Sequence, residues 1–514
     1  EIDLLKPNGY LSMINQQAWM FLGSFEKLRT KILNNFRICS MIHLGMGTFG
    51  ADFGTTSFVI TRNECNDSKF FRLVNEKTSE QKEIKYLDDL KTNNYYLSNN
   101  DKLKKIVGYP IAYWVSDSII KAFENNLLMN IASTKQGLAT GDNDKFLRLW
   151  WEVDYNSIKF DSHDSLEALS SGKKWFPCNK GGEFRKWYGN NYRLVNWYND
   201  GDELKKFKGS VLRNVDTYFK EGLTWSSMTS SSLSMRYSEH GKIYESKGSM
   251  CFVNDSKNIY YILGLLNSKV VNELLLILSP TLDYHEGPMG KVPIIIDNNK
   301  FDVVSNLVLE NIELVKKDWN SHEYSYDFEF GVKTNVLIED EYIRLSEEKK
   351  CDINKLKSNE YKINEIFINI YGLEKDITPE IPDNEISIKE LTEDEFVKSI
   401  ISYSVGCMFG RYKFNDKFID KDNFITLSDD SNIYFEDDIV GKFKEFIKLY
   451  FGNENFDKNI EYIAKIIGRK GTESLEETLR RYFINNFYND HKRLFNNLPI
   501  YWLISSGDKN GFKG

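Results

Sequence analysis

The sequence has few of the residues that build metal sites, disulfides or disordered linkers. Its 514 residues include only nine Pro, six Cys and six His. The Cys stand far apart, at 39, 65, 178, 251, 351 and 407, and no His pair has the spacing of a zinc ligand set. We therefore expect no metal, no disulfide framework of the secreted kind and a reduced, cytoplasmic setting, with His285 and His491 as ordinary hydrogen-bonding residues.

Long apolar runs are also missing. No segment approaches the ~20 apolar residues that a bilayer-spanning helix needs. The first residues lack the charged and then apolar pattern of a secretory signal. The sequence thus predicts a soluble protein that is not exported.

Aromatic and cationic residues are concentrated between Ile106 and Pro293. Seven of the ten Trp lie between Trp114 and Trp225, and the stretch from Ser171 to Lys247 has fourteen Lys or Arg against eight Asp or Glu. The whole chain carries a net charge of −8, so this cationic region is local. Phosphate attracts such regions, and aromatic rings stack on unpaired bases. The pattern favours nucleic-acid binding, whereas the alternative is that the Trp are core residues and the Lys a solvated face.

The length predicts two to four domains. The segment Tyr10 to Ile14, the segment Arg37 to His43 and the segment Thr56 to Ile60 have strand patterns, and Phe25 to Phe36 has helical spacing, which indicates an α/β sheet. A charged segment follows, then short strands and turns with one helical stretch around YYILGLLNSKVVNELLLIL. After Phe301 the apolar spacing is that of amphipathic helices. The expected fold is α/β followed by mixed α+β, with a mainly helical end.

Several long segments, in the same order, resemble the PglX family of adenine-specific DNA methyltransferases in BREX phage-defence systems. They include LLKPNGYLSMINQQAWMFLGSFEKLR, GTFGADFGTTSFVITR, KQGLATGDNDKFLRLWWEV, KWFPCNKGGEFRKWYGNN, LTWSSMTSSSLSMR and SYSVGCMFGRY. The resemblance covers nearly the whole chain. It implies the second half of a Rossmann-like methyltransferase domain at 1–62, a charged insertion or linker at 63–105, a DNA target-recognition domain at 106–298 and a mainly helical C-terminal domain at 299–514.

Two motifs of the family are absent from the sequence. Methyl transfer requires a Gly-rich turn for S-adenosylmethionine, and the glycines of Leu44 to Gly50 follow the wrong strand. It also requires an Asn-Pro-Pro-Tyr or Asp-Pro-Pro-Tyr tetrapeptide that holds the target amine, and no Pro-Pro occurs. We expect the chain to start after these motifs, so we assign no catalytic residue and predict that it is inactive alone. An endonuclease is not indicated either, since no nuclease metal-binding pattern occurs.

The resemblance places five residues near the target base: Asn15, Gln16, Trp19, Phe49 and Phe53. For DNA contacts we expect the cations and amides of the aromatic region, which are Lys180, Arg185, Lys186, Asn190, Asn191, Arg193, Lys205, Lys206, Lys208, Arg213, Arg236, Lys242 and Lys247. Arg185, Asn190, Asn191, Arg193 and Arg236 have the chemistry to contact base edges. The segment Gly137 to Asn143 is either a tight loop that presents backbone donors or a plain turn between strands.

Three functions follow as hypotheses. The first is a site-specific adenine methyltransferase that uses S-adenosylmethionine on duplex DNA, once its upstream residues are present. The second is a DNA-specificity module without chemistry of its own. The third is a scaffold for other defence proteins, in which the C-terminal helices matter most.

Overall fold

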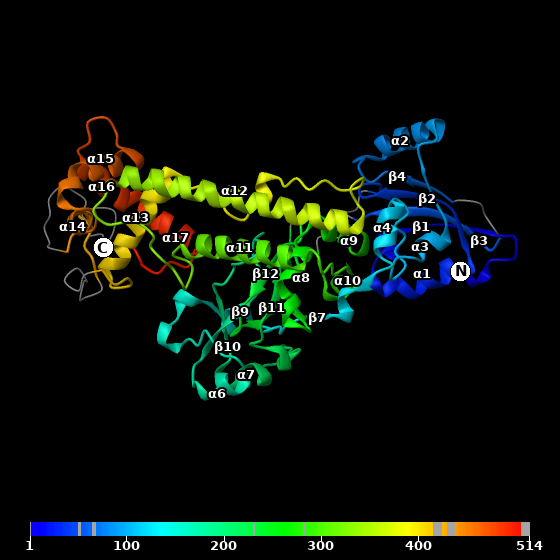
Figure 1. Ribbon diagram of the computed structural model, residues 1–514, viewed down its shortest axis with the longest axis horizontal. Coiled ribbons are helices and arrows are strands. Elements are labelled where there is room, and N and C mark those ends of the chain that lie inside the picture. The colour runs from blue at the N-terminus through cyan, green and yellow to red at the C-terminus, as the bar shows by residue number, and fades with distance from the viewer. Residues whose placement is uncertain are drawn as a thin grey trace.

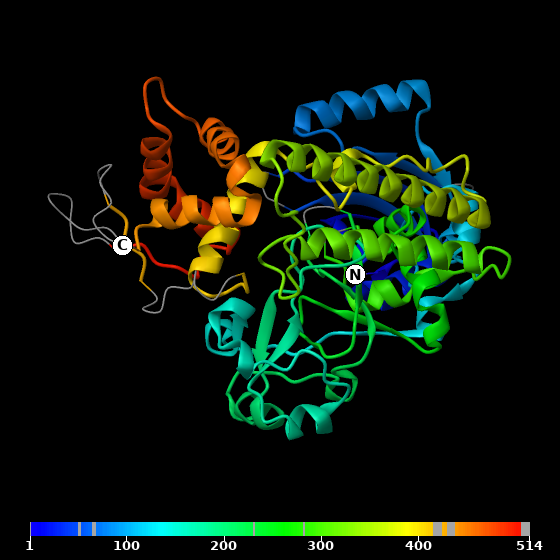
Figure 2. The ribbon, with the colours of Figure 1, turned by 60° about the vertical axis from the view of Figure 1, so that its left-hand side comes forward.

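The computed structural model describes residues 2–49, 53–63, 68–229, 232–280, 283–414, 424–428 and 437–504. The molecule is elongated (Figure 1), with an N-terminal sheet at one end, a helical C-terminal part at the other and a β-rich central part between them. Two long helices lie side by side over the central part, roughly along the long axis of the molecule, and the longer one reaches the C-terminal part (Figures 1 and 2). The predicted order of an α/β sheet, a mixed part and a helical end is therefore confirmed.

The N-terminal sheet has five strands in the order β1-β3-β2-β4-β5. Their bounds are β1 Tyr10–Gln16, β2 Arg37–Gly45, β3 Thr55–Thr61, β4 Ser68–Arg72 and β5 Tyr96–Ser98. Strand β3 is antiparallel to both β1 and β2, so β1 and β2 run in the same direction, and β4 is parallel to β2. The three strands predicted from the sequence are present, and helix α1, Glu26–Asn35, connects β1 to β2 as expected.

Helix α1 covers one face of this sheet. Ile32 and Leu33 of α1 are buried with Met41 and Phe58 from the strands. The other face is open at β1, where Tyr10 is 66% exposed and Ile14 is 57% exposed. Apolar side chains on an open sheet face indicate a surface that packs against another layer.

The segment expected as a charged insertion or linker, 63–105, belongs to the same sheet. It supplies β4 and β5 together with helices α2, Ser79–Thr92, and α3, Asn100–Leu103. Phe70 lies in the core on the α1 side, and Phe71 packs against Tyr86 of α2. The expectation of a linker was wrong for residues 68–98, because two consecutive Phe supply both faces of a short strand within a charged context. Cys65 lies outside the described residues.

The central part contains two four-stranded sheets, ordered β13-β9-β10-β8 and β12-β11-β14-β7, and the pair β15-β6. The strands are β6 Asn126–Leu127, β7 Ala132–Lys135, β8 Leu147–Leu149, β9 Trp175–Asn179, β10 Arg193–Asn196, β11 Gly222–Trp225, β12 Met235–Ser238, β13 Ile243–Tyr244, β14 Met250–Val253 and β15 Pro293–Ile294. The helices around them are α4 Asp117–Ala122, α5 Asn143–Phe146, α6 Ser165–Ser170, α7 Tyr198–Lys206 and α10 Glu286–Gly290.

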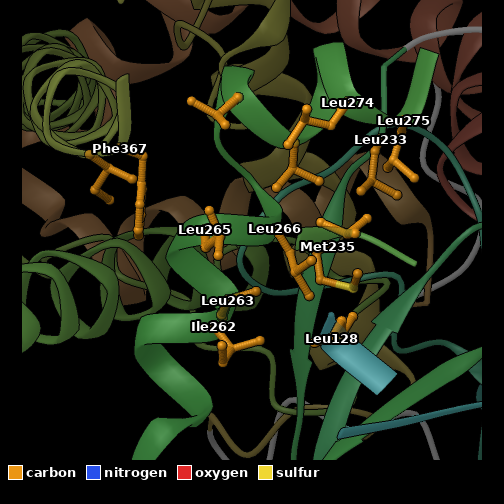
Figure 3. Close-up of a cluster of buried hydrophobic side chains, with 14 of the residues drawn as sticks. Leu128, Leu233, Met235, Ile262, Leu263, Leu265, Leu266, Leu274, Leu275 and Phe367 are labelled. Carbon is orange, nitrogen blue, oxygen red and sulfur yellow. The ribbon is translucent and has the colours of Figure 1, made fainter. Parts of the chain in front are cut away.

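The single helical stretch predicted after β14 is two helices, α8, Ile259–Leu266, and α9, Lys269–Leu278. The Ser268 side chain accepts a hydrogen bond from the backbone of Val271 and caps α9, which stops α8 and bends the pair by 77°. Their Leu side chains lie in a core shared with Phe367 (Figure 3). Among the described helices, none alone is long and apolar enough to cross a membrane. Helices α8 and α9 reach the required length and apolar composition only when they are taken together as this bent pair.

The C-terminal part is helical, as predicted. Its helices are α11 Phe301–Asn320, α12 Ile338–Tyr371, α13 Glu393–Met408, α14 Ile439–Phe451, α15 Phe456–Ile466, α16 Leu475–Tyr482 and α17 Tyr488–Leu494. Helix α12 is 34 residues long. Its first residue, Ile338, lies in the C-terminal core, whereas Phe367 and Tyr371 lie in the central core. One helix therefore contributes to both cores.

Candidate nucleic-acid interface

The structure divides the predicted DNA-contacting residues by exposure. Five are buried: Lys186, Asn190, Asn191, Arg236 and Lys242. Four are partly buried, namely Lys180, Arg185, Arg193 and Arg213, and four are exposed, namely Lys205, Lys206, Lys208 and Lys247. Since a phosphate group must reach the cation that binds it, only the second and third groups present a surface to DNA.

Lys186 is an internal connection. Its Nζ lies 2.9 Å from Oε2 of Glu360 in α12, and both side chains are buried. The neighbouring Trp187 donates from Nε1 to the other carboxylate oxygen of Glu360 at 2.7 Å. The backbone N of Lys186 also donates to Oγ of Ser387 at 2.9 Å. The prediction that Lys186 contacts DNA was wrong, because this ammonium neutralises a buried acid.

Arg185 has a similar role on α11. Its guanidinium lies 2.6 Å from Asp318 and over the ring of Trp319. Burial opposes ionisation of Asp318, but Lys349, 2.9 Å away, and Arg185 outweigh burial, so the pKa of Asp318 is lowered. The cations of the FRKW sequence thus fasten the central part to α11 and α12.

Arg236 and Lys242 are buried, and neither forms an ion pair within 4.0 Å among the described residues, although Glu239 and Asp327 act on Lys242 electrostatically. Arg236 donates from Nη1 to the carbonyl of Arg185 at 3.4 Å, and burial lowers its pKa to about 10. Lys242 donates to Asn191 at 3.4 Å, and burial lowers its pKa to about 8. Asn190 donates to the carbonyl of Glu183 at 3.0 Å. Their burial contradicts the prediction that these four residues contact DNA.

Both lysines of α7 are exposed, and both form ion pairs within the helix. Lys205 lies 2.6 Å from Asp200 and Lys206 lies 2.7 Å from Asp202. Lys208, just beyond the helix, has no ion pair in the part of the chain that the structure describes. Arg213 donates to the carbonyl of Gly137 at 3.4 Å. DNA contact by these residues stays a prediction.

Three loops converge at one rim of the central part, and we call them the rim loops: 180–182, 226–228 and 247–248. Ser226 donates from Oγ to the carbonyl of Gly182 at 3.0 Å, and the N of Ser227 donates to the carbonyl of Lys247 at 3.1 Å. A Cβ on Gly248 would lie 2.3 Å from the carbonyl oxygen of Asn179. Glycine is therefore required for the loops to approach this closely.

The rim loops carry two cations that lack an ion pair within the described ranges. Lys247 is exposed, and Lys180 is partly buried, so that burial lowers the pKa of its ammonium. Arg193 lies close enough to Lys180 to lower that pKa further, while Glu245 opposes the effect. Three of the predicted DNA-contacting cations, Lys180, Arg193 and Lys247, lie in or next to the rim loops and have no ion-pair partner among the described residues. They are therefore available to bind an anion such as phosphate.

The backbone of Gly137 to Asn143 is used internally. Ala139 exchanges two backbone hydrogen bonds with Val211, both 2.8 Å, and the N of Leu138 donates to the carbonyl of Tyr244 at 3.0 Å. A Cβ on Gly137 would lie 1.9 Å from that same carbonyl oxygen. These donors face other strands, which favours the plain connecting turn over a donor loop.

Of the five residues expected near the target base, the structure places some next to one another and buries one in the core. Gln17 donates from its backbone N to the carbonyl of Gly54 at 2.8 Å, which places Asn15 and Gln16 beside the loop that carries Phe53. Phe53 is 44% exposed and Phe49 is 59% exposed. Trp19 is instead a core residue: it is 3% exposed, donates from Nε1 to Thr56 at 2.9 Å and packs on Phe58.

Two buried His are hydrogen-bonded within the core. His43, which the sequence did not single out, lies 3.2 Å from the hydroxyl of Tyr113 and 3.0 Å from Oε1 of Gln17, and burial lowers its pKa to about 4. His491 accepts from the backbone N of Ile500 and Tyr501 at 3.0 and 3.2 Å, which confirms a hydrogen-bonding role. No group of three metal-binding side chains occurs among the described residues.

The sequence is similar to two curated proteins over almost its whole length. It is 33% identical over 554 residues to the adenine-specific methyltransferase PglX of Lacticaseibacillus casei (strain Zhang) and 35% identical over 570 residues to the adenine-specific methyltransferase BrxX of Escherichia coli O9:H4 (strain HS). Each alignment covers 99% of this chain. The predicted relationship to the PglX family is confirmed. The chain spans 46% of the length of both PglX-family relatives.

Other comparisons add little to the PglX relationship. No protein-family model matches the sequence. The solved structure of the Type IIL restriction-modification enzyme MmeI in complex with DNA aligns with 73% of this chain and 48% of its own, at 10% identity and a TM-score of 0.44. A nuclease-deletion mutant of the Type ISP enzyme LlaGI with a DNA substrate mimic aligns with 61% and 36%, at 10% identity and a TM-score of 0.35. Similarities of this size carry no structural argument.

Proposed function

We propose that the chain forms the DNA-recognition and C-terminal parts of a site-specific adenine DNA methyltransferase of a BREX phage-defence system. The whole enzyme would transfer a methyl group from S-adenosylmethionine to the exocyclic amine of adenine in duplex DNA. The observation that carries this proposal is the 33–35% identity to two adenine-specific methyltransferases across 99% of the chain.

The N-terminal sheet supports a place in a Rossmann-like domain. Strands β1 and β2 run in the same direction and are connected by α1, with β3 antiparallel between them. Mixed sheets of this kind occur among doubly wound folds, whose two faces are both covered. The open face at Tyr10 and Ile14 is what one half of such a domain leaves exposed. Residues 1–62 are therefore proposed as the second half of the methyltransferase domain.

The catalytic step is proposed to depend on residues other than these 514. The sequence lacks a Gly-rich cofactor turn and a Pro-Pro tetrapeptide, so the residues present do not fit S-adenosylmethionine and we assign no step to them. Asn15, Gln16, Phe49 and Phe53 remain proposed for the vicinity of the target base, since ligands of open α/β sheets bind at the carboxyl ends of strands.

DNA recognition is assigned to residues 106–298, with the rim loops as the principal contact. Lys180, Arg193 and Lys247 are proposed to contact phosphates there, and Lys205, Lys206, Lys208 and Arg213 are proposed to extend the cationic surface.

The test is a methyl-transfer assay on the longer protein that contains these residues. Labelled S-adenosylmethionine and host DNA without adenine methylation are the substrates, and the intact mass of the purified enzyme is measured in parallel. Wild-type enzyme is expected to label the DNA, whereas a Lys180→Ala, Lys247→Ala double variant is expected to require higher DNA concentrations. Lys257→Ala, an exposed lysine of the same part, is the matched control. No labelling by an intact wild-type enzyme would refute the proposal.

A second candidate is a DNA-specificity module or a scaffold for other defence proteins, without chemistry of its own. The observation that favours it is that two ion pairs, the partly buried Arg185–Asp318 and the buried Lys186–Glu360, fasten the recognition part to the long helices. Sequence-specific DNA binding by the longer protein without methyl transfer would support the module. Co-purification with defence proteins after nuclease treatment would support the scaffold.

A further inference from the structure

Met228 is an exposed apolar side chain at the tip of a rim loop. It is 60% exposed, although the two preceding residues, Ser226 and Ser227, are 6% and 2% exposed. Apolar residues are usually buried and polar residues exposed, but here the two serines are buried and the large apolar Met228 faces solvent. A single exposed Met needs no explanation by itself, so its attachment and surroundings decide its meaning.

The loop that carries Met228 is fastened on three sides. Trp225, which is fully buried, donates from Nε1 to the carbonyl of Tyr284 at 2.8 Å. The N of Tyr284 donates to the carbonyl of Ser227 at 2.7 Å, and the backbone of Met228 pairs with that of Asp283. With the bonds to Gly182 and Lys247 given above, these contacts fix the backbone at Met228, from which the exposed side chain projects.

Lys180, Lys247 and His285, together with the acidic Asp283, belong to the segments that meet at this apolar tip. The rim loops bring Lys180 and Lys247 to the same edge through backbone contacts. His285, which is 54% exposed, lies 3.2 Å from Asp283, the residue paired with Met228. An apolar side chain between phosphate-binding groups is the arrangement that proteins use to insert a wedge between base pairs.

The tip also lies toward the N-terminal sheet. Asp283 is three residues before α10, and Lys291, which follows α10, pairs with Glu26 of α1 at 3.0 Å. A cavity of about 120 Å³ at this junction is lined by Phe21 and Gly23 from the segment after β1 and by Gly287 and Pro288 of α10. Figure 1 places α9 and α10 between the central strands and the N-terminal sheet. DNA bound at the rim would therefore lie next to the part that carries Asn15 and Gln16.

We propose that Met228 enters the base stack beside the target adenine and occupies the space that the adenine leaves when it is extruded. This inference rests on the proposed adenine methylation, because a base must leave the duplex to reach a methyltransferase pocket. The fastened loop supplies a wedge that costs little ordering on binding. The role needs volume and apolarity at this position and no specific hydrogen bond.

The experiment uses the longer enzyme and a duplex with its recognition sequence, found by mapping methylated adenines in host DNA. Met228→Ala is compared with wild type on a matched duplex and on one with a mismatch opposite the target adenine. We expect Met228→Ala to lose about tenfold in methyl-transfer rate on the matched duplex and to recover most of it on the mismatch, where extrusion costs less. DNA affinity is expected to change by less than about threefold.

Two further variants and one probe complete the test. Met228→Leu, which keeps size and apolarity, is expected to retain the rate, and Leu166→Ala, an exposed apolar residue of α6, is the matched control. With 2-aminopurine at the target position, wild type is expected to raise fluorescence on binding and Met228→Ala to raise it less. Thermal unfolding of each variant verifies the fold.

The outcomes separate the two proposals. An intact wild type that neither methylates nor binds a specific site overturns the proposed function and this inference with it. A working wild type with a Met228→Ala variant that matches it on both duplexes overturns the inference alone. An equal loss on matched and mismatched duplexes also overturns it, because a wedge is needed less when the target pair is already open.

Discussion

The ammonium of Lys186 lies 2.9 Å from the carboxylate of Glu360, and the two residues are 4% and 3% exposed in their side chains. One belongs to the recognition part and the other to α12, 174 positions later in the chain. A buried charge is costly when it is left unpaired, so this contact favours one position of the recognition part on the helix.

Removing one charge of this pair should destabilise the protein strongly. Glu360→Gln keeps an acceptor for Trp187 but leaves Lys186 without its counter-ion, so we expect a loss of about 3–5 kcal/mol in the free energy of unfolding. Urea unfolding followed by Trp fluorescence measures it. Asp202→Asn, which breaks the exposed pair with Lys206, should change stability by less than about 1 kcal/mol. Equal effects of the two variants would show that the buried pair contributes no more than a surface pair.

His43 should make the stability depend on pH. Burial lowers its pKa to about 4 in the folded protein, against about 6.5 when unfolded, so its contribution is complete above pH 6.5 and is lost as the pH falls toward 4. His43→Gln should flatten the dependence in this window, while His491, whose pKa is also lowered to about 4, continues to contribute. His285→Gln, at a half-exposed site, is the control. An unchanged pH profile for His43→Gln would contradict the prediction.

Lys247 should bind DNA through charge alone. Lys247→Ala is expected to lower affinity for all sequences alike and to reduce the slope of log Kd against log salt by about 1. Fluorescence anisotropy at several salt concentrations measures the slope. Lys257→Ala should leave it unchanged. A sequence-dependent loss for Lys247→Ala would instead indicate contact with a base.

Gly248 should tolerate no side chain. A Cβ there would lie 2.3 Å from the carbonyl oxygen of Asn179, so Gly248→Ala must separate two rim loops and is expected to cost about 1–3 kcal/mol and to weaken DNA binding. Gly287→Ala is the matched control, because a Cβ at Gly287 meets nothing within 4 Å. Thermal unfolding and DNA titration measure both effects. Normal DNA affinity for Gly248→Ala would show that the loops need not pack this closely.

The sequence predicted elements whose residues satisfy a local rule. The alternation of β1 and β3 and the helical spacing of α1 depend on neighbouring residues, so their positions were correct. Strand β4 was missed because its five residues lie in a charged segment and only Phe70 and Phe71 mark its two faces. The break between α8 and α9 depends on the cap at Ser268, a signal that a long apolar pattern conceals.

Amino-acid composition did not predict which cations of the candidate site are buried and which are exposed. Lys186 and Lys247 are both cations of the same region, yet one is buried against Glu360 and the other is exposed. Lys186 is buried because its partner, Glu360, lies 174 positions later in the chain, and the local sequence does not reveal such a partner. Met228 was not predicted as a functional residue, because the sequence does not show that it is exposed. Its exposure is clear only from the structure, in which β11 and the two serines after it are buried.

Helix α12 gives the molecule a mechanical property. At about 1.5 Å per residue its 34 residues extend about 50 Å, and about 33 Å of the helix separates Glu360 from Ile338, its first residue. A tilt of about 5° of the helix at Glu360 would displace Ile338 by about 3 Å over that distance. If the chain binds DNA as proposed, a small adjustment of the recognition part would be amplified along this helix, as by a lever arm, into a movement of the C-terminal part comparable to the length of a hydrogen bond.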